Sequence, residues 1–124
     1  MSIPQPDIRP IEDGKYRLAK NYRIKHSGYH FTLLAGFIHD GASIPRIVWP
    51  IIGMTQDGLL RGAALIHDAL YRNGGIMEPI EHVFTRKESD RIFYSLMAEA
   101  GVKPRRAYLA YLGVRLFGYW SFKG

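Results

Sequence analysis

Cysteine is absent from the 124-residue sequence, and no apolar run reaches the length of a membrane span. Without cysteine the chain can form no disulfide, no thiolate metal site and no cysteine nucleophile. A membrane-spanning helix needs about 20 mainly apolar residues, so no transmembrane segment is expected. The first residues, MSIPQPDIRPIEDG, hold prolines and acids where a signal peptide would have a basic start and an apolar run. We therefore expect a protein made in the cytoplasm.

Acidic residues are also scarce, since 11 Asp and Glu stand against 17 Lys and Arg, for a formal net charge of +6. A basic chain favours anionic partners such as nucleic acid, anionic lipid or an acidic protein surface. The basic residues are dispersed, and the densest group is K-P-R-R at residues 103–106, so we find no specific nucleic-acid signal. The hydrophobic fraction of 47% is that of a globular chain, and the length is that of one domain.

The order of the local patterns predicts an α+β fold, with a small N-terminal antiparallel β-sheet followed by a three-helix unit. Residues 1–14 hold three prolines and are expected to form an extended arm, with a single domain over residues 15–124. Residues 15–25 and 29–38 are rich in Tyr, Phe, Ile and Leu and predict the two strands of a hairpin. The turn signals of HDGASIP, residues 39–45, end the sheet.

Start and stop signals predict the three helices. The first runs from about residue 57, with Thr55 or Asp57 as its cap, and ends at residue 72 before Asn-Gly-Gly. The second follows Thr85, which forms a capping box with Glu88, and carries an apolar stripe. The third covers residues 104–117, with proline in its first turn.

The third helix and the chain end combine aromatic and basic residues. They predict either a core stripe with a solvated basic edge or a face that lies on a membrane surface. The residues concerned are Tyr108, Tyr111, Phe117, Tyr119, Trp120 and Phe122, with Lys103, Arg105, Arg106 and Arg115.

A histidine and an aspartate, His67 and Asp68, lie side by side within the apolar first helix, AALIHDALYRN. Burying an ionised carboxylate is costly unless the group is paired, hydrogen-bonded or bound to a metal. Tyr71 follows His67 by one helical turn and shares its face. Because the first two helices should pack antiparallel, Asp90 in the second helix can reach the His67 ring or the Tyr71 hydroxyl. We therefore expect a polar cluster between these helices.

Such a cluster can carry out hydrolysis. A carboxylate that holds one imidazole nitrogen leaves the other to act as a base, so His67 is the candidate base, Asp90 its orienting group and Tyr71 a support. Asp68 can bind a hard cation together with backbone carbonyls of residues 40–43, the turn that contains Asp40. The cation would polarise a carbonyl and stabilise an oxyanion.

The same residues also have a structural interpretation. His67 and Asp68 can pair with helix and loop groups in the core, where a buried polar network fixes helix register. Asp90 is also a first-turn acid of the kind that the helix dipole favours, and Asp40 is typical of local turn hydrogen bonding. The sequence leaves the catalytic and the structural interpretation open.

Four stretches together resemble a known family. They are F-I-H-DGASIP-R, AALIHDALYR, TRKESDRIFYSLM and the basic-aromatic final helix, within residues 29–118. In this respect the chain resembles small phage and prophage proteins catalogued as domain-of-unknown-function 1353. The resemblance implies a phage origin and supplies no established activity.

A second resemblance is confined to HDALYRN, which is similar to the active-site helix of phospholipase A2, particularly the bacterial form. It implies that His67 is the base that activates water, that Asp68 binds Ca²⁺ and that Asp90 orients His67. It also implies that Asp40 and Gly41 belong to the calcium loop. The chain departs from that family in having no cysteine and a single glycine in the loop.

Two functions follow from these patterns. The first is a phage-encoded, calcium-dependent hydrolase that acts on an ester or amide, with a lipid or cell-envelope substrate. The second is a virion structural or assembly protein, such as a tail or connector component, in which the His-Asp-Asp cluster is only a buried network. Its partners would be phage structural proteins or further copies of the chain. Either protein is expected in the host cytoplasm when made, and the second also in the virion.

Overall fold

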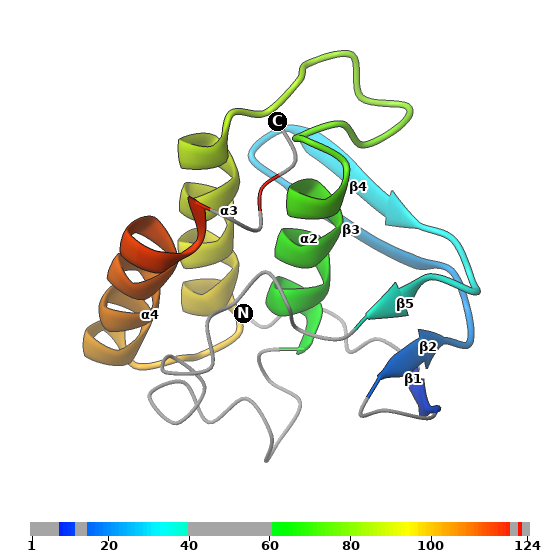
Figure 1. Ribbon diagram of the computed structural model, residues 1–124, viewed down its shortest axis with the longest axis horizontal. Helices are drawn as coiled ribbons and strands as arrows, with labels where there is room; N and C mark the ends of the chain where they lie inside the picture. Colours follow the sequence, from blue (N-terminus) through cyan, green and yellow to red (C-terminus); the bar gives the residue numbers. More distant parts are fainter. Residues whose placement is uncertain (1–7, 12–14, 40–60, 120–121, 123–124) are drawn as a thin grey trace.

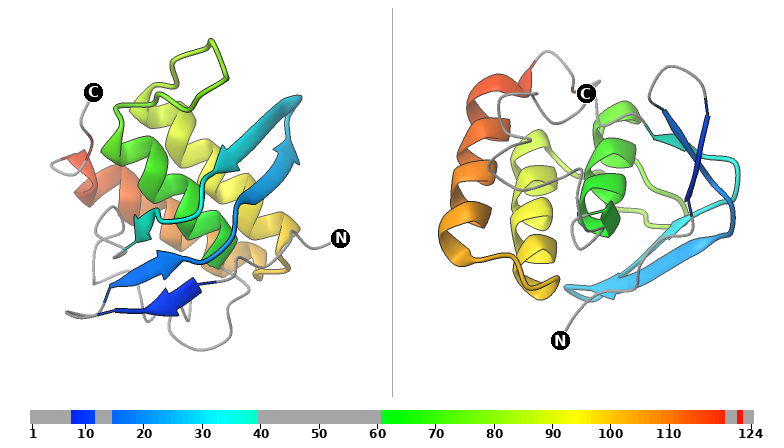
Figure 2. Two further views of the ribbon diagram at one scale, coloured as in Figure 1. Left: turned by 90° about the vertical axis from the view of Figure 1, so that its right-hand side faces the viewer. Right: turned by 90° about the horizontal axis from the view of Figure 1, so that it is seen from below.

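The computed structural model describes residues 8–11, 15–39, 61–119 and 122 of the chain. The three described helices lie in a row, and the strands cover the side of α2 that faces away from α3 (Figures 1 and 2). This arrangement confirms the predicted α+β fold. The elements are β1 (Ile8–Pro10), β2 (Tyr16–Leu18), β3 (Tyr22–His26), β4 (Tyr29–Leu33), β5 (Ile38–His39), α2 (Arg61–Arg72), α3 (Arg86–Glu99) and α4 (Pro104–Phe117).

The described strands form two small antiparallel sheets. One has the order β1-β2-β5, and the other is the predicted hairpin of β3 and β4, which turns at Ser27 and Gly28, both with positive φ. The stretch predicted as one strand over residues 15–25 is divided into β2 and β3, and residues 29–38 are divided into β4 and β5. β1 lies within the stretch predicted as an arm, and His39, predicted in the turn after the hairpin, ends β5.

Two features of the backbone explain why each of the two predicted strands is divided. Gly36 has a φ of 98°, a conformation that turns the chain after β4 and that residues with a side chain rarely adopt. On the neighbouring segment, the side-chain oxygen of Asn21 accepts a hydrogen bond from the backbone N–H of Ala35 at 2.9 Å. Asn21 thus satisfies a backbone group that has left the strand ladder.

The hairpin buries one face and exposes the other. Tyr22, Ile24 and His26 of β3 point inward, as do Phe31 and Leu33 of β4, in the alternation expected of a strand with one face on the core. The His26 ring contacts the carboxylate of Glu99 on α3 at 3.1 Å. The hairpin is therefore joined to the helices by apolar packing and by the contact between His26 and Glu99.

Helix α2 is the buried centre of the described structure. Every residue from 62 to 71 is buried, because the strands cover one side and α3 covers another. The helix ends at Arg72, as predicted, and Gly74 and Gly75 follow with positive φ. Residues 57–60 of the predicted helix, and its candidate caps Thr55 and Asp57, lie outside the described residues. The burial places His67, Asp68 and Tyr71 away from bulk water.

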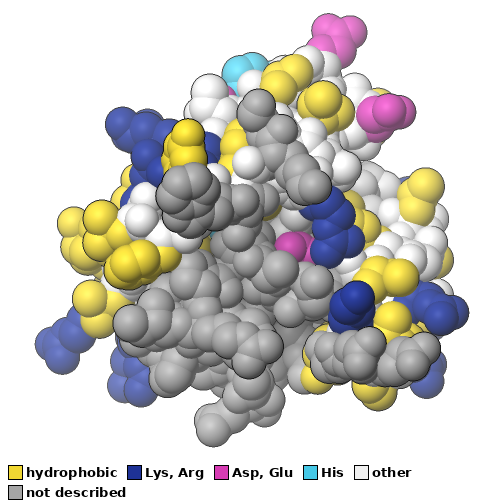
Figure 3. All heavy atoms as spheres, in the orientation of Figure 1, with side chains coloured by type: hydrophobic (Ala, Val, Ile, Leu, Met, Phe, Trp, Pro, Cys, Tyr) yellow, Lys and Arg dark blue, Asp and Glu magenta, His cyan; other side chains and the backbone are white. Residues whose placement is uncertain are grey.

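Helix α3 begins with the predicted capping box of Thr85 and Glu88, and α4 begins with proline as expected. The core stripe predicted on α4 is wrong in part, because α4 packs through small residues that allow close helix contact: Ala107, Ala110, Gly113 and Val114 are buried. Its large side chains therefore gather on the outer surface (Figure 3), where Tyr108, Leu109, Leu116 and Phe117 are exposed, as is Tyr119 just after the helix. No described helix is long and apolar enough to cross a lipid bilayer.

Candidate functional site

The predicted polar cluster forms between α2 and α3. His67 and Tyr71 lie one turn apart on α2, with ring centroids 4.2 Å apart, and Phe93 of α3 packs against the His67 ring at 4.6 Å. Figure 1 shows that the two helices run antiparallel, which brings the early part of α3 to the later part of α2. This geometry delivers Asp90 to both His67 and Tyr71, as the sequence predicted.

Asp90 is the centre of the cluster and is fully buried. Its Oδ1 lies 2.7 Å from Nε2 of His67 and accepts a hydrogen bond from the Tyr71 hydroxyl at 2.6 Å. Its Oδ2 accepts a hydrogen bond from Nη1 of Arg115 at 2.8 Å. The nearest guanidinium nitrogen of Arg86 is 3.7 Å from the same oxygen. One carboxylate therefore joins residues from α2, α3 and α4.

Arg86 also contacts groups other than Asp90. Arg86 donates to the backbone carbonyls of Val114 and Arg115, each at 3.0 Å, and lies 3.4 Å from the Tyr71 hydroxyl. These carbonyls belong to the last turn of α4, and that of Val114 also accepts the backbone N–H of Gly118 at 2.9 Å. Arg86 thus anchors the end of α4 to the start of α3 and completes the shell around Asp90.

The surroundings set the protonation of the cluster. Burial alone raises the pKa of the Asp90 carboxyl, but the hydrogen bond and charge of His67, and then the bonds from Tyr71 and Arg115, outweigh it. The pKa of Asp90 therefore lies below its ordinary value of 3.8, and the group is an anion at neutral pH. Burial, helped by the Asp90 anion, raises the pKa of the Tyr71 hydroxyl, which stays protonated and donates its hydrogen.

Asp68 is buried on a different side of α2 and is 3% exposed. Its Oδ2 accepts a hydrogen bond from Arg72 at 3.0 Å, one turn further along the helix. Arg72 also donates to the carbonyl of Ile38 at 2.6 Å and stacks over the Phe37 ring at 5.0 Å. Asp68 and Arg72 therefore connect α2 to the segment that contains β5.

The proposed calcium ligands are only partly within the described structure. Asp68 is described, whereas Asp40 and Gly41 lie outside the described residues. Over the ranges that the structure describes, no group of three or more His, Cys, Asp or Glu residues is placed to hold a metal ion. Ca²⁺ takes about six to eight oxygen ligands, so Asp68 by itself is not a calcium site.

The sequence identified the centre of the cluster but missed its basic half. His67, Tyr71 and Asp90 were predicted to meet, and they do. Arg86 and Arg115 were not predicted to join them. Arg86 stands four residues before Asp90 on α3, a spacing that favours an ion pair and that the sequence does display. Arg115 has no such local signal, because it belongs to another helix.

This arrangement can do two things chemically. A buried carboxylate bound to one nitrogen fixes the orientation of the His67 ring, which suits proton transfer. A carboxylate with donors from three helices also fixes the packing of those helices. Both interpretations involve the same side chains, and both include the burial of His67 and Asp90.

Comparisons with known proteins give a family without a described activity. A family model described as "Protein of unknown function (DUF1353)" matches residues 16–114. The chain is also 39% identical over 85 residues to the uncharacterized protein y4iH of Sinorhizobium fredii (strain NBRC 101917 / NGR234). This similarity covers 67% of the chain and 32% of the relative, so the chain spans about a third of the relative's length. No solved structure matches the chain.

Proposed function

We propose that the cluster around His67 is the active site of an ester or amide hydrolase. The chain that carries this cluster belongs to the protein family of unknown function DUF1353. The observation that carries this proposal is the contact of 2.7 Å between Nε2 of His67 and Oδ1 of Asp90. A base held by a buried carboxylate is the arrangement that general-base catalysis uses. The additional bonds from Tyr71 and Arg115 hold Asp90 itself in place.

In the proposed reaction His67 is the catalytic base and Asp90 is a positioning residue. With Nε2–H donating to Asp90, the neutral ring carries its lone pair on Nδ1. Nδ1 takes a proton from water while the water oxygen bonds to the substrate carbonyl carbon, whose π electrons move to the carbonyl oxygen. When this tetrahedral intermediate collapses, the bond to the leaving group breaks, and the leaving oxygen or nitrogen takes the proton from Nδ1. Asp90 remains ionised and stabilises the imidazolium, in keeping with its lowered pKa.

Ca²⁺ is the cofactor that we propose for this reaction. Asp68 would provide a carboxylate, with further oxygens from Asp40 and Gly41 in the part of the chain outside the described residues. A cation bound there supplies positive charge that polarises the substrate carbonyl. Its binding has to compete with Arg72, which now pairs with Asp68 at 3.0 Å.

The substrate class that we propose is a lipid or another component of the cell envelope, attacked by a phage-encoded protein. The outer surface of α4 supports this choice, because it combines exposed apolar side chains with arginines and has no acidic residue. Tyr108, Leu116 and Tyr119 are between 53% and 71% exposed. A helix surface of this composition suits an anionic lipid surface.

The test compares hydrolysis by the wild type, His67→Asn and the control His30→Asn. The substrates are a nitrophenyl ester and phosphatidylglycerol vesicles, each with and without calcium. Loss of the base should lower kcat by about 10²–10⁴, whereas His30 is exposed on β4, away from the cluster, and its variant should keep the wild-type rate. Thermal unfolding checks that His67→Asn folds. A folded wild type that cleaves neither substrate, or an unchanged rate in His67→Asn, would contradict the proposal.

Calcium binding has its own test. Titration calorimetry on the wild type, Asp68→Asn and the control Glu78→Gln should show binding that disappears only in Asp68→Asn, because Glu78 is an exposed acid on the loop after α2. The absence of heat with wild-type protein would remove calcium from the proposal. It would leave the His67–Asp90 base, which needs no metal for its proton transfer.

A second candidate function is favoured by the burial of the cluster. The His67 and Asp90 side chains are both 0% exposed, and Arg86 and Arg115 tie Asp90 to the end of α4. We propose as the alternative a virion structural or assembly protein, in which the network holds three helices in register. Its partners would be phage structural proteins or copies of the chain. Sedimentation that finds a stable ring or larger oligomer, with no hydrolysis by the wild type, would favour this alternative, and a purely monomeric, active protein would exclude it.

A further inference from the structure

The segment that contains β2 to β5 carries positive charge and no negative charge. From residue 15 to residue 39 the sequence contains no Asp or Glu. Figure 3 shows Lys and Arg side chains over β1 and β2, on the right of the view. The basic residues of this segment are Lys15, Arg17, Lys20, Arg23 and Lys25. The positive charge is therefore distributed unevenly over the surface, although the basic residues are dispersed along the sequence.

The outer face of the hairpin is the best-defined part of this basic surface. Arg23 and Lys25 alternate with the buried residues of β3, so both point away from the core. Across the ladder Arg23 pairs with Thr32, and Lys25 pairs with His30. Within the described ranges, no hydrogen bond or ion pair joins the side chains of Arg23, Lys25 or His30 to another residue. Their donors are available to a ligand.

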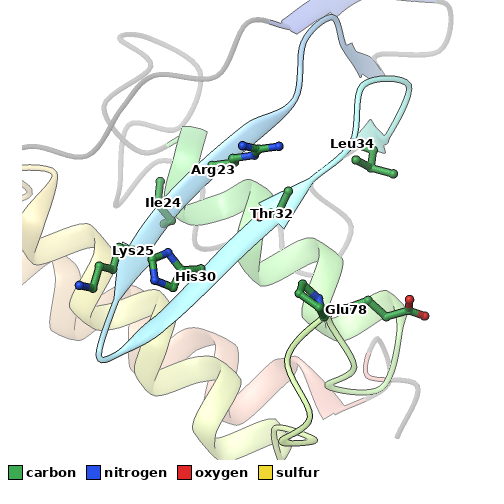
Figure 4. A pocket seen from close by; sticks show the side chains of 8 residues that line it. Arg23, Ile24, Lys25, His30, Thr32, Leu34 and Glu78 are labelled. Atoms are coloured by element: carbon green, nitrogen blue, oxygen red, sulfur yellow. The ribbon is translucent and has the colours of Figure 1, made fainter.

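These side chains border a groove of about 600 Å³ (Figure 4). The far wall is formed by Glu78 and Pro79 of the loop between α2 and α3. Glu78 is the one acid in the lining, and in Figure 4 its carboxylate points away from the cations of β3. The rest of the lining consists of Arg23, Ile24, Lys25, His30, Thr32 and Leu34.

We propose that the outer face of the β3–β4 hairpin binds double-stranded DNA through its phosphates. A two-stranded ribbon, with strands about 4.8 Å apart, fits a major groove about 12 Å wide. Arg23 and Lys25 then contact phosphates, and the exposed Arg17 of β2 extends the contact along the backbone. The groove lining has no Tyr, Phe or Trp on which an unpaired base could stack, which favours duplex over single strand. This binding does not depend on the His67 site.

The charge pattern also distinguishes this face from the surface of α4. The hairpin face presents Arg, Lys, His and Thr, with the exposed Leu34 at the end of the groove and no large apolar side chain between the two cations and their cross-strand partners. On α4, by contrast, exposed apolar residues accompany the arginines. A lipid surface needs apolar side chains to insert, whereas phosphate binding to DNA needs cations and hydrogen-bond donors. The hairpin fits the second partner.

The experiment measures fluorescence anisotropy of a labelled duplex over a range of salt concentrations. The test variant is Arg23→Gln with Lys25→Gln. The matched control is Arg105→Gln with Arg106→Gln, which removes the same charge from exposed positions on α4, beyond α2 and α3 in Figure 2. Each phosphate contact adds about 0.9 to the slope of log K against log salt concentration. The test variant should therefore lower the slope by about 1.8, with at least a tenfold loss of affinity near about 0.1 M salt.

The control variant should keep the slope of the wild type and stay within about threefold of its affinity, since long-range attraction falls off over about 10 Å at this salt concentration. Equal losses in the two double variants would mean attraction to net charge alone and would overturn the proposed surface. Absence of wild-type binding to duplex, or hairpin-dependent binding to phosphatidylglycerol vesicles in its place, would overturn it as well. The same variants are also assayed for hydrolysis. Loss of duplex binding with unchanged hydrolysis concerns the hairpin surface alone, whereas absent hydrolysis with intact duplex binding concerns the proposed His67 chemistry alone.

Discussion

Replacing Asp90 by asparagine is the most informative single change, because it keeps the size of the side chain and removes its charge. The new amide group has one oxygen and one NH₂ in place of two acceptors. His67 and Tyr71 now share Oδ1, and Arg115 binds Oδ2 at 2.8 Å. If the NH₂ faces Arg115, a donor meets a donor; if it faces His67 and Tyr71, both groups must change from donating to accepting. In either orientation Arg115 and Arg86 lose the anion that they face. We therefore expect Asp90→Asn to fold with a large loss of stability.

The expected loss is about 3 kcal/mol in the free energy of unfolding. Removal of one partner from a buried ion pair typically costs about 3–5 kcal/mol. The side chains of Arg115 and Arg86 are 27% and 19% exposed, so water can solvate part of their charge, which favours the lower end of that range. For a urea m-value of about 1–3 kcal/mol/M, the midpoint should fall by about 1–3 M.

The pH dependence gives a second measurement of the same interaction. Since the pKa of Asp90 in the folded protein lies below its ordinary value of 3.8, the native state favours the ionised form. This contribution is fully present above the ordinary value and is lost as the pH falls through the lower folded value. The difference in stability between wild type and Asp90→Asn should thus stay constant from neutral pH down to about pH 4 and shrink below it.

The matched control for Asp90 is Glu99→Gln, which removes a charge from the other end of α3. Glu99 is 46% exposed and contacts His26 at 3.1 Å. Because water reaches the half-exposed Glu99 carboxylate, its contact with the buried His26 contributes at most about 1 kcal/mol. Urea denaturation that gave equal losses for Asp90→Asn and Glu99→Gln would refute the argument that Asp90 is the electrostatic centre of the helices.

Three further changes test the backbone on either side of α3. Gly75→Ala should cost about 3 kcal/mol or more in urea denaturation, because its φ is 88° and a Cβ would lie 1.7 Å from the carbonyl oxygen of Phe84. Gly101→Ala, with a φ of 94° and open space, should cost only about 1–2 kcal/mol, and equal losses would contradict the steric argument. Thr85→Ala removes the bond to the Glu88 N–H and should cost about 1 kcal/mol in thermal unfolding; an unchanged Tm would refute the cap.

Local signals explain what could be predicted from the sequence. The α3 boundary follows from Thr85 and Glu88, and the end of α2 from Gly74 and Gly75, because caps and positive φ values are properties of a few adjacent residues. The meeting of Asp90 with α2 follows from the antiparallel packing expected of two consecutive helices joined by a single loop, residues 73–85. The roles of the residues that meet there stay predictions.

Contacts between distant elements could not be predicted in the same way. The contact of Arg115 with Asp90 depends on how α4 crosses α3, and that crossing depends on Ala107, Ala110 and Gly113. A sequence pattern ranks large apolar residues as core, whereas here small residues form the contact and large ones face outward. The helix is amphipathic, but its buried side is the one with less hydrophobic volume.

The strands show a different limit. Residues 15–39 have a uniform strand-like composition, so the pattern predicts two long strands. The division into four shorter strands depends on the turn at Gly36 and on the bond from Asn21 to the other segment. Glycine and asparagine are common in many kinds of local structure. Their effect here depends on which segment lies beside them in the folded chain.

The shared carboxylate of Asp90 has a consequence for how this protein can evolve. Loss of Arg115 first leaves an aspartate that still has His67, Tyr71 and the nearby Arg86, a tolerable intermediate. Loss of Asp90 first leaves two guanidinium groups facing each other without an anion. The same pair of substitutions is therefore accessible in one order and blocked in the other, so the history of the chain constrains which variants it can reach.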